Sequence, residues 1–369
     1  MTIYYFTISV IAGLGFILTD KKKEKKKTVI YIILSFLILV FTASFRYAIG
    51  FDYFSYKNIY ETISGLEFND ILNYYWKEPL FFILCKLFCI LGCPYHLFLV
   101  FLNIFLISAV LWFVFNYSKI PWTSIYFYIT LQFLAYNMNL LRQSVALTFF
   151  LFAYPFLKDK KIVPYTILII TGGMFHNTLL LLFPFYFLLT KKNTKKYTLL
   201  VIVLSVLIYY FFDPFFSLIM PMLPEKYADY FDGYFWKPST YVYVIPSALY
   251  CILIYLFRKR IRGDIQRSLY INSAIYNFII NLFITKHFIL ERFSVYPFAI
   301  SLIAIPEIIY SYRRKGKKQT TSYYCVLILF ILYGIAYFLF AAYKGFHNVY
   351  PYISLLDKSH SSPVNQNHP

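Results

Sequence analysis

Five charged or titratable side chains lie where long hydrophobic segments begin or end, and their types suit anion binding and proton transfer. Arg46, Arg142 and Arg292 carry planar guanidinium groups that can bind phosphate-type oxygens and stabilise developing negative charge without a metal. His176 and Asp52 are candidate general bases. Because ionisable residues beside membrane segments are costly, they are functional candidates by default. We expect Arg46, Arg142, His176 and Asp52 to be catalytic.

The composition indicates which elements must position these residues. Of the 369 residues, 60% are hydrophobic and 14% are charged. The apolar residues form repeated blocks of about 15 to 25, which is typical of a polytopic membrane protein. Because backbone amides in hydrocarbon must be satisfied within their own segment, the blocks predict helices. Their number is too great for a barrel of alternating ten-residue strands. The expected fold is all-α, an integral membrane helical bundle.

The formal net charge of +19 is carried by short Lys/Arg clusters between the apolar blocks. These clusters are KKKEKKK at 21–27, KDKK at 158, KKNTKK at 191, RKRIRG at 258 and RRKGKK at 313. Such spacing is the positive-inside signal of cytoplasmic turns. We therefore expect the chain to lie in a lipid bilayer and do not expect a nucleic-acid partner.

With each basic cluster cytoplasmic, we expect about twelve transmembrane helices in a single integral membrane domain, 1–369. The expected spans are 2–19, 29–45, 94–116, 122–138, 141–157, 197–212, 241–257, 269–286, 293–310 and 321–343, with two short helices within 162–190 that meet at GGMFHN. The outer segments are the loops 46–78 and 213–240 and the tail 344–369. The block 79–92 is the shortest and contains Lys86, so we expect a re-entrant or interfacial segment there.

On this topology several polar and aromatic groups converge on the outer side. The expected substrate-binding residues are Tyr53, Tyr56, Glu78, Gln143, Asn177, Tyr227, Arg292 and Asn348. Simpler roles stay open: Arg46 at a helix end can snorkel to lipid headgroups, His176 can bond a neighbouring carbonyl, and Arg292 can form a plain ion pair with Glu291.

Several signatures of known chemistry are missing from the sequence. There is no GxxxxGK[ST] phosphate loop, GxGxxG, HExxH or GxSxG motif. Cys85, Cys89 and Cys93 could share one helix face, but thiols at this spacing more often pack as small apolar groups. The DYFD stretch at 229–232 is weak evidence for a divalent cation. We expect neither a metal nor a cofactor.

Five stretches, in this order and at this approximate spacing, resemble the EpsG-like branch of the Wzy-type polysaccharide polymerases. They are FRYAIGFDYFSYKNIYE (45–61) with WKEPLF after it, LLRQSVALTFFLFAYPFLKDKK, YTILIITGGMFHNTLLLLFPFYFL, EKYADYF and FHNVYPY. Their order and approximate spacing agree along nearly the whole chain. The tail reads NVYPY where an aliphatic residue is more usual before the proline. The family's arginine, histidine and GxDY positions fall in this chain on Arg46, Arg142, His176, Asp52 and Tyr53.

The resemblance implies a metal-independent membrane glycosyltransferase that joins undecaprenyl-diphosphate-linked oligosaccharide repeat units. It implies work on the outer face of a bacterial cytoplasmic membrane, in the synthesis of O-antigen, capsule or exopolysaccharide. In that reaction the arginines would hold the departing diphosphate, His176 or Asp52 would take the acceptor proton, and outer-loop tyrosines would bind sugars. A chain-length regulator protein is a partner that only the resemblance implies.

Three other functions remain as alternatives. An O-antigen ligase would use similar donors, but the expected outer loops are shorter than the external domain usual in ligases. A lipid-linked oligosaccharide flippase would place charges along a central cavity, whereas the charges in this chain gather on one face. A membrane O-acyltransferase would also use a histidine, but it would need access to a cytosolic acyl donor.

Overall fold

The computed structural model describes residues 1–20, 25–219, 241–313 and 317–356, and every regular element in these ranges is a helix. This confirms the predicted all-α class. The first helices are α1 (Thr2–Gly15), η1 (Phe16–Asp20), α2 (Lys25–Ser44), α3 (Tyr53–Ser64), α4 (Phe68–Tyr74), α5 (Pro79–Ile90), α6 (Tyr95–Tyr117), α7 (Pro121–Thr130), α8 (Phe133–Asn139), α9 (Leu141–Lys158) and α10 (Ile162–Gly173). The others are η2 (Asn177–Leu181), α11 (Leu182–Thr190), α12 (Lys195–Ile219), α14 (Val244–Phe257), η6 (Arg258–Arg260), α15 (Asp264–Ile284), η7 (Phe288–Leu290), α16 (Glu291–Ala299), α17 (Ser301–Ser311), α18 (Lys317–Tyr343) and η8 (Phe346–Asn348).

Within the described ranges, six segments are long and apolar enough to cross a membrane. They are Thr2–Thr19, Lys25–Ser44, Tyr95–Tyr117, Lys195–Pro214, Phe288–Ser311 and Thr321–Tyr343. The remaining predicted crossings fall on shorter or more polar helices, so the count of about twelve stays a prediction. The helix α5 has 12 residues, and at about 1.5 Å per residue it is too short to span hydrocarbon about 30 Å thick. Its re-entrant or interfacial position also stays a prediction.

Two predicted blocks are divided in different ways. The prediction of one continuous helix over 122–138 is wrong, because Gln132 has φ +71° and a helix cannot continue through a left-handed residue. The block 162–190 does divide as predicted, with α10 ending at Gly173 and η2 beginning at Asn177. Two glycines, Gly172 and Gly173, mark the break after α10 in the sequence. Neither glycine nor proline marks the break at Gln132.

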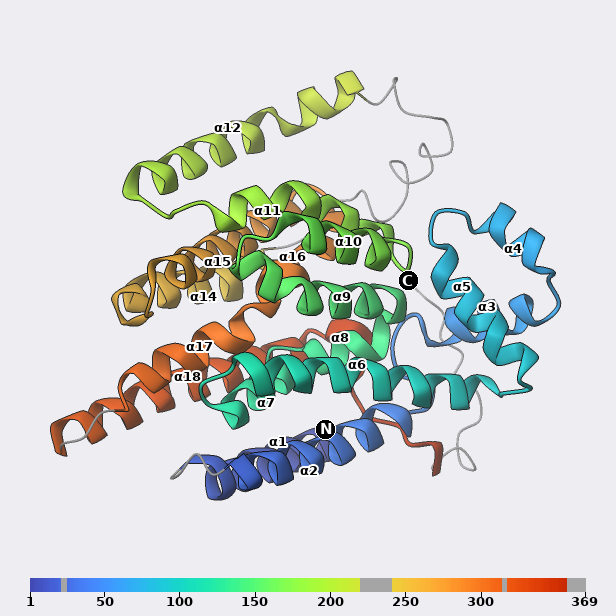
Figure 1. Ribbon diagram of the computed structural model, residues 1–369, viewed down its shortest axis with the longest axis horizontal. Helices are drawn as coiled ribbons and strands as arrows, with labels where there is room; N and C mark the ends of the chain where they lie inside the picture. Colours follow the sequence, from blue (N-terminus) through green and yellow to red (C-terminus); the bar gives the residue numbers. More distant parts are fainter. Residues whose placement is uncertain (21–24, 220–240, 314–316, 357–369) are drawn as a thin grey trace.

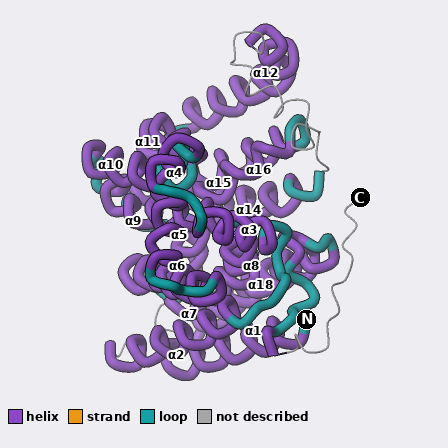
Figure 2. The backbone as a smooth tube through the Cα atoms, turned by 90° about the vertical axis from the view of Figure 1, so that its right-hand side faces the viewer, coloured by secondary structure: helices purple, strands orange, loops and turns teal. Residues whose placement is uncertain are grey.

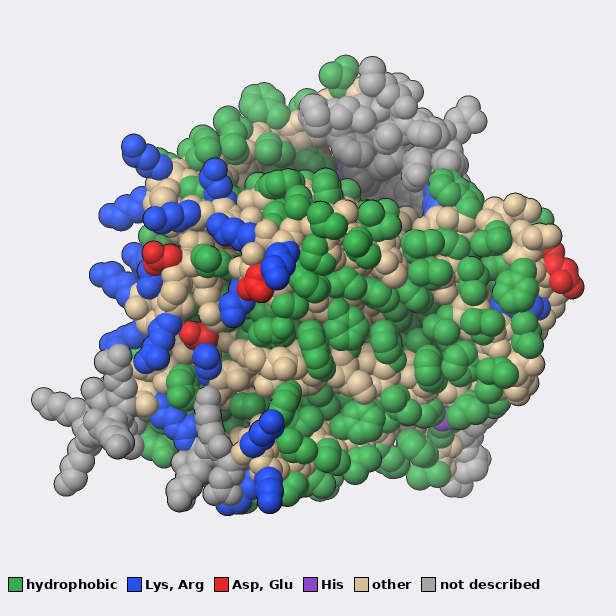
Figure 3. Space-filling model, in the orientation of Figure 1, with side chains coloured by type: hydrophobic (Ala, Val, Ile, Leu, Met, Phe, Trp, Pro, Cys, Tyr) green, Lys and Arg blue, Asp and Glu red, His purple; other side chains and the backbone are tan. Residues whose placement is uncertain are grey.

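The helices lie side by side along the long axis of the molecule, with α3, α4 and α5 together at one end (Figure 1). Lys and Arg side chains gather at the opposite end, and hydrophobic side chains cover the surface between the two ends (Figure 3). The helix α12 lies at the margin of the bundle in both views, and none of its spanning segment is buried (Figure 1 and Figure 2). Charge is therefore segregated along the helix direction, as the basic clusters predict.

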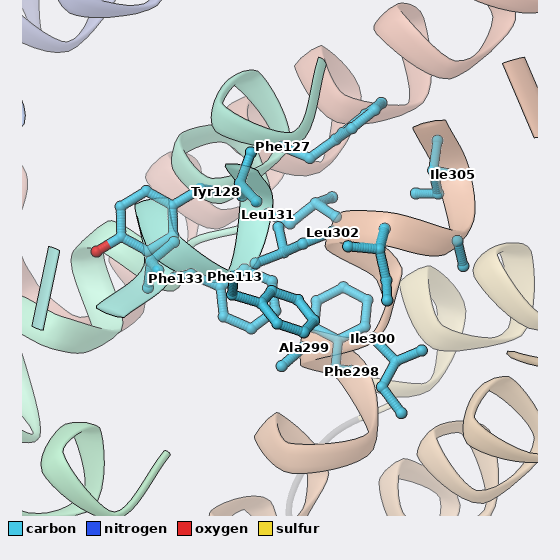
Figure 4. Packing of buried hydrophobic residues seen from close by; sticks show 14 of the residues in the cluster. Phe113, Phe127, Tyr128, Leu131, Phe133, Phe298, Ala299, Ile300, Leu302 and Ile305 are labelled. Carbon is cyan, nitrogen blue, oxygen red and sulfur yellow. The ribbon is translucent and has the colours of Figure 1, made fainter. Parts of the chain in front are cut away.

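The main core lies in the middle of the bundle, where the broken α7 and α8 meet α16 and α17. Phe133 stacks on Phe298 with ring centroids 5.3 Å apart, and Leu131 and Leu302 pack beside them (Figure 4). A second core joins α3 and α5 to the outer half of α6 and to the start of α9. This second core fixes the outer helices on the bundle.

Candidate active site

The predicted outer loop 46–78 is folded into the helices α3 and α4. Tyr53, Tyr56 and Tyr60 follow helical spacing and are buried in the second core, each with 5–6% of its surface exposed. Tyr53 and Tyr56 therefore hold the outer helices in place, and little of either side chain is free to bind a sugar.

Glu78 lies just before α5, whose first helical residue is Pro79. Proline is favoured at this position because its missing N–H has no helical partner to lose. The carboxylate of Glu78 is 7% exposed and is shared by two other segments. Its Oε2 accepts a hydrogen bond from Arg142 Nη1 at 2.6 Å, and its Oε1 lies 2.7 Å from His176 Nδ1. Oε1 also accepts the backbone N–H of Asn177 at 3.1 Å. We call Glu78, Arg142 and His176 the outer triad.

Two glycines at the end of α10 position His176. A Cβ atom on Gly172 would overlap Leu179 and Phe149, and one on Gly173 would overlap Leu180. The absence of these atoms lets η2 fold back closely against α10. The N–H of His176 then donates to the Gly172 carbonyl at 3.1 Å, which directs the imidazole toward Glu78.

Arg142 is the second residue of α9, which begins at Leu141 directly after the break at Leu140. Its guanidinium lies between the rings of Tyr56 and Phe82, at 5.9 and 5.7 Å from their centroids. The side chain is 31% exposed, unlike that of Glu78. Arg142 is thus held by a carboxylate and two aromatic rings while part of its side chain remains exposed.

Asp52 and Arg292 lie within electrostatic reach of the triad. Burial raises the pKa of Asp52, and the positive charges of Arg292 and Arg142 oppose that rise. The backbone N–H of Asp52 donates to Asn139 Oδ1 at 3.1 Å. Gln143 donates from its side-chain amide to the Arg292 carbonyl, which ties α9 to α16. The structure therefore brings together six predicted site residues, namely Asp52, Glu78, Arg142, Gln143, His176 and Arg292, with Asn177 contributing its backbone.

The environment of the triad sets its protonation. Burial lowers the pKa of His176, although the carboxylate of Glu78 partly opposes this effect. Burial alone would raise the pKa of Glu78, but contacts with His176, Arg142 and Asn177 outweigh it and lower that pKa. Glu78 is then ionised and His176 neutral at pH 7. Nδ1 lies 2.7 Å from the Glu78 carboxylate without forming a regular hydrogen bond to it. Because a carboxylate cannot donate, we assign the proton of the neutral ring to Nδ1 and the lone pair to Nε2.

Arg46 lies in a different place, which we call the strap region. Its side chain is 1% exposed and donates to the Ala43 carbonyl. Residues 346–355, the C-terminal strap, lie alongside it, with Tyr47 N–H donating to the Ile353 carbonyl at 2.9 Å. Asn348 belongs to the strap and accepts the Gly50 N–H through its backbone carbonyl at 3.0 Å. Tyr227 lies outside the described residues.

Sequence reasoning missed two contributors to this arrangement. Phe82 is one of the two aromatic rings beside the Arg142 guanidinium, and the Asn139 side chain accepts the backbone N–H of Asp52. Neither stands out in the sequence, because Phe82 lies in an ordinary apolar run and Asn139 follows an unmarked break. Among the described residues, no three His, Cys, Asp or Glu side chains gather as a metal site would require.

Neither a curated protein nor a solved structure matches the chain significantly. The model of the EpsG family matches residues 29–354, a range that includes the outer triad and most of the strap. Since the match covers most of the chain, this protein belongs to the EpsG family of membrane proteins, which is associated with polysaccharide polymerisation.

Proposed function

We propose that the protein is a glycosyltransferase that polymerises undecaprenyl-diphosphate-linked oligosaccharide repeat units on the outer face of the bacterial cytoplasmic membrane. The observation that carries this proposal is the outer triad: one buried carboxylate, Glu78, orients a partly exposed arginine and a neutral histidine. The triad lies beside α5, at the end of the bundle away from the Lys/Arg side chains (Figure 1 and Figure 3). By the positive-inside rule, that end faces the periplasm or the cell exterior.

The proposed reaction transfers a growing glycan from its lipid carrier to the next repeat unit. A hydroxyl oxygen of the acceptor sugar bonds to the anomeric carbon of the donor chain. The bond from that carbon to the phosphate oxygen breaks, and its electron pair leaves with undecaprenyl diphosphate. Arg142, supported by Arg292, holds the negative charge that develops on the diphosphate. Because Glu78 binds Arg142 through Nη1 and part of the arginine side chain is exposed, we expect Arg142 to bind phosphate oxygens without leaving Glu78.

The acceptor hydroxyl must lose a proton as it attacks, and His176 Nε2 is the proposed base. This nitrogen is buried and has no hydrogen-bond partner among the described residues. Glu78 holds the opposite side of the ring in the required tautomer and stabilises the imidazolium that forms, as the carboxylate of a hydrolase triad does. Asp52 is the second candidate, because burial raises its pKa toward the range of a useful base.

The test compares surface polysaccharide from a deletion strain complemented with wild type, Arg142→Ala or Arg258→Ala. Arg258 is the control, since it stacks on Tyr255 in a basic turn that ends α14. We expect single repeat units with no protein or with Arg142→Ala, and a full ladder with wild type or Arg258→Ala, at equal membrane abundance. A deletion strain that makes full-length but unattached polymer would indicate a ligase. Repeat units that stay on the inner face would indicate a flippase. A normal ladder with Arg142→Ala would contradict the proposed role of the triad.

A further inference from the structure

A cavity of about 60 Å³ with a mixed polar and aromatic lining lies beside the outer triad, and none of the three triad side chains lines it. It is lined by Gln132 at the α7–α8 break, Tyr136 on α8, Asn277 on α15 and Glu291 at the start of α16, with aromatic rings around them. Glu291 directly precedes Arg292, and the Arg292 carbonyl is bound by Gln143. The cavity is therefore adjacent to the triad through α16.

Three buried side chains that line this cavity each carry a polar atom without a hydrogen-bond partner in the described structure. Gln132, Tyr136 and Asn277 are 4%, 6% and 2% exposed. Gln132 Nε2, Tyr136 Oη and Asn277 Oδ1 have no hydrogen-bond partner among the described residues. Such groups are costly to bury unless a ligand or water satisfies them. The cavity thus offers hydrogen bonds that the protein itself leaves unmade.

The orientation of both amide groups is fixed by their other atom. Gln132 Oε1 accepts from Tyr350 Oη at 2.8 Å, so its Nε2 is left as a donor. Asn277 Nδ2 donates to the Ser294 carbonyl at 3.0 Å, so its Oδ1 is left as an acceptor. The hydroxyl of Tyr136 can do either. A bound group must therefore both donate and accept, as a sugar hydroxyl does.

The remaining lining residues narrow the ligand class. No Lys or Arg among the described residues lines the cavity to bind a diphosphate, and a polyprenyl chain would leave the amide groups unpaired. Phe298 and Tyr243 provide aromatic surface, which packs well on the apolar face of a pyranose. Since a water needs about 10–15 Å³ of such volume, a cavity of about 60 Å³ has room for the hydroxyl-bearing edge of one ring and not for a whole oligosaccharide.

We propose that this cavity binds one sugar of the repeat unit, with the rest of the oligosaccharide extending toward the outer surface. That the ligand is a sugar of the repeat unit rests on the proposed function. The preference of the cavity for a neutral, hydroxyl-rich ligand does not. Binding there would place an adjoining part of the oligosaccharide next to Arg292 and the triad.

The test measures binding of a labelled repeat-unit oligosaccharide, prepared by partial depolymerisation of the host's surface polysaccharide, to the full chain in lipid nanodiscs. Tyr136→Phe removes only the unpartnered hydroxyl, so it preserves packing, and we expect about fivefold weaker binding. Asn277→Ala should weaken binding about tenfold. Asn103→Ala is the matched control, because Asn103 is also buried and unpartnered within the described structure but does not line the cavity. It should bind as wild type does.

Two results would overturn the assignment: wild type shows no saturable binding, or both Tyr136→Phe and Asn277→Ala bind as tightly as wild type. Thermal unfolding of each variant shows whether it is folded. Joining of lipid-linked repeat units is measured separately on the same samples. If the oligosaccharide binds and the variants weaken it, but no units are joined, the cavity assignment holds and the proposed polymerase function fails.

Discussion

Two arginines that look alike in the sequence occupy opposite environments in the structure. Arg46 and Arg142 each stand at the end of a hydrophobic segment on the predicted outer side, and both were expected to bind the same anion. Arg142 is paired with Glu78 at 2.6 Å and is 31% exposed. Arg46 is 1% exposed, lies among tyrosines near the strap, and forms no ion pair within the described residues.

This difference separates the proposed site of Arg142 from the buried position of Arg46. A guanidinium can stabilise a departing diphosphate only if substrate can reach it, and a counter-ion must hold it in place before substrate arrives. Arg142 meets both conditions. Arg46 meets neither condition. Its side chain is almost fully buried, and its guanidinium donates to the backbone carbonyl of Ala43 instead of to a carboxylate.

Glu78→Ala should have the largest effect, because one carboxylate orients both Arg142 and His176. We expect chain joining to fall by about 10³-fold or more, in line with loss of the carboxylate in a catalytic triad. The measurement is the rate of polymer growth per mole of folded protein in membranes.

Glu67→Ala is the matched control for that change, since Glu67 is an exposed acid at the start of α4. It should retain wild-type activity. A Glu78→Ala variant with near-normal growth of the polymer would remove the basis for setting the triad apart from the strap region.

His176→Gln tests whether the triad supplies a base in addition to binding. Glutamine can keep a polar contact with Glu78 but cannot accept the proton, so we expect the rate to fall by about 10²–10⁴-fold with little change in acceptor KM. His96→Gln, at the start of α6, should leave the rate unchanged. A change in KM alone would instead assign His176 to substrate binding.

The pH dependence of the activity also tests whether His176 is the base. His176 must be neutral to accept a proton, and burial lowers its pKa from the ordinary value near 6.5. Activity should therefore be level near neutral pH and be lost as the pH falls through that lowered pKa. Glu78 raises the pKa of His176, so Glu78→Gln should move the acid limb of the residual activity to still lower pH. An acid limb that moves upward in Glu78→Gln would show that another group is the base.

Arg46→Met should have the smallest effect on activity of the changes proposed here. It directly tests the contrast between Arg46 and Arg142. The methionine keeps most of the buried volume and removes a charge that is costly to bury, so the free energy of unfolding should change by less than about 1.5 kcal/mol. Activity per folded molecule should change by less than about threefold, because no contact with the reacting groups is lost. Thermal unfolding and polymer growth are measured on the same membranes. A folded Arg46→Met protein that is as inactive as Arg142→Ala would show that the two arginines act together.

The helices were predictable because long apolar blocks between basic clusters have few alternatives in a membrane. The break at 174–176 was predictable for a similar local reason, the glycine pair before His176. The break at Gln132 was not, since its left-handed conformation has no marker in the sequence. The helices α3 and α4 were also missed, because short amphipathic helices resemble a polar loop when only apolar blocks are sought.

The candidate site was predictable by residue type but not by geometry. Glu78 was expected only to bind substrate, and nothing near it in the sequence indicates that it orients Arg142 and His176, which lie 64 and 98 positions later. The burial of Arg46 depends on a strap about 300 residues away. Such long-range packing is absent from local sequence patterns, so the two arginines could not be told apart before the fold was known.

The most direct test of the central claim is the joining reaction itself, with purified protein in nanodiscs and lipid-linked repeat units extracted from the deletion strain. We predict that wild type lengthens the glycan and releases one undecaprenyl diphosphate for each bond formed, while folded Glu78→Ala and Arg142→Ala do neither. The claim would be contradicted if wild type lengthened no chains, or if these two variants lengthened them at the wild-type rate.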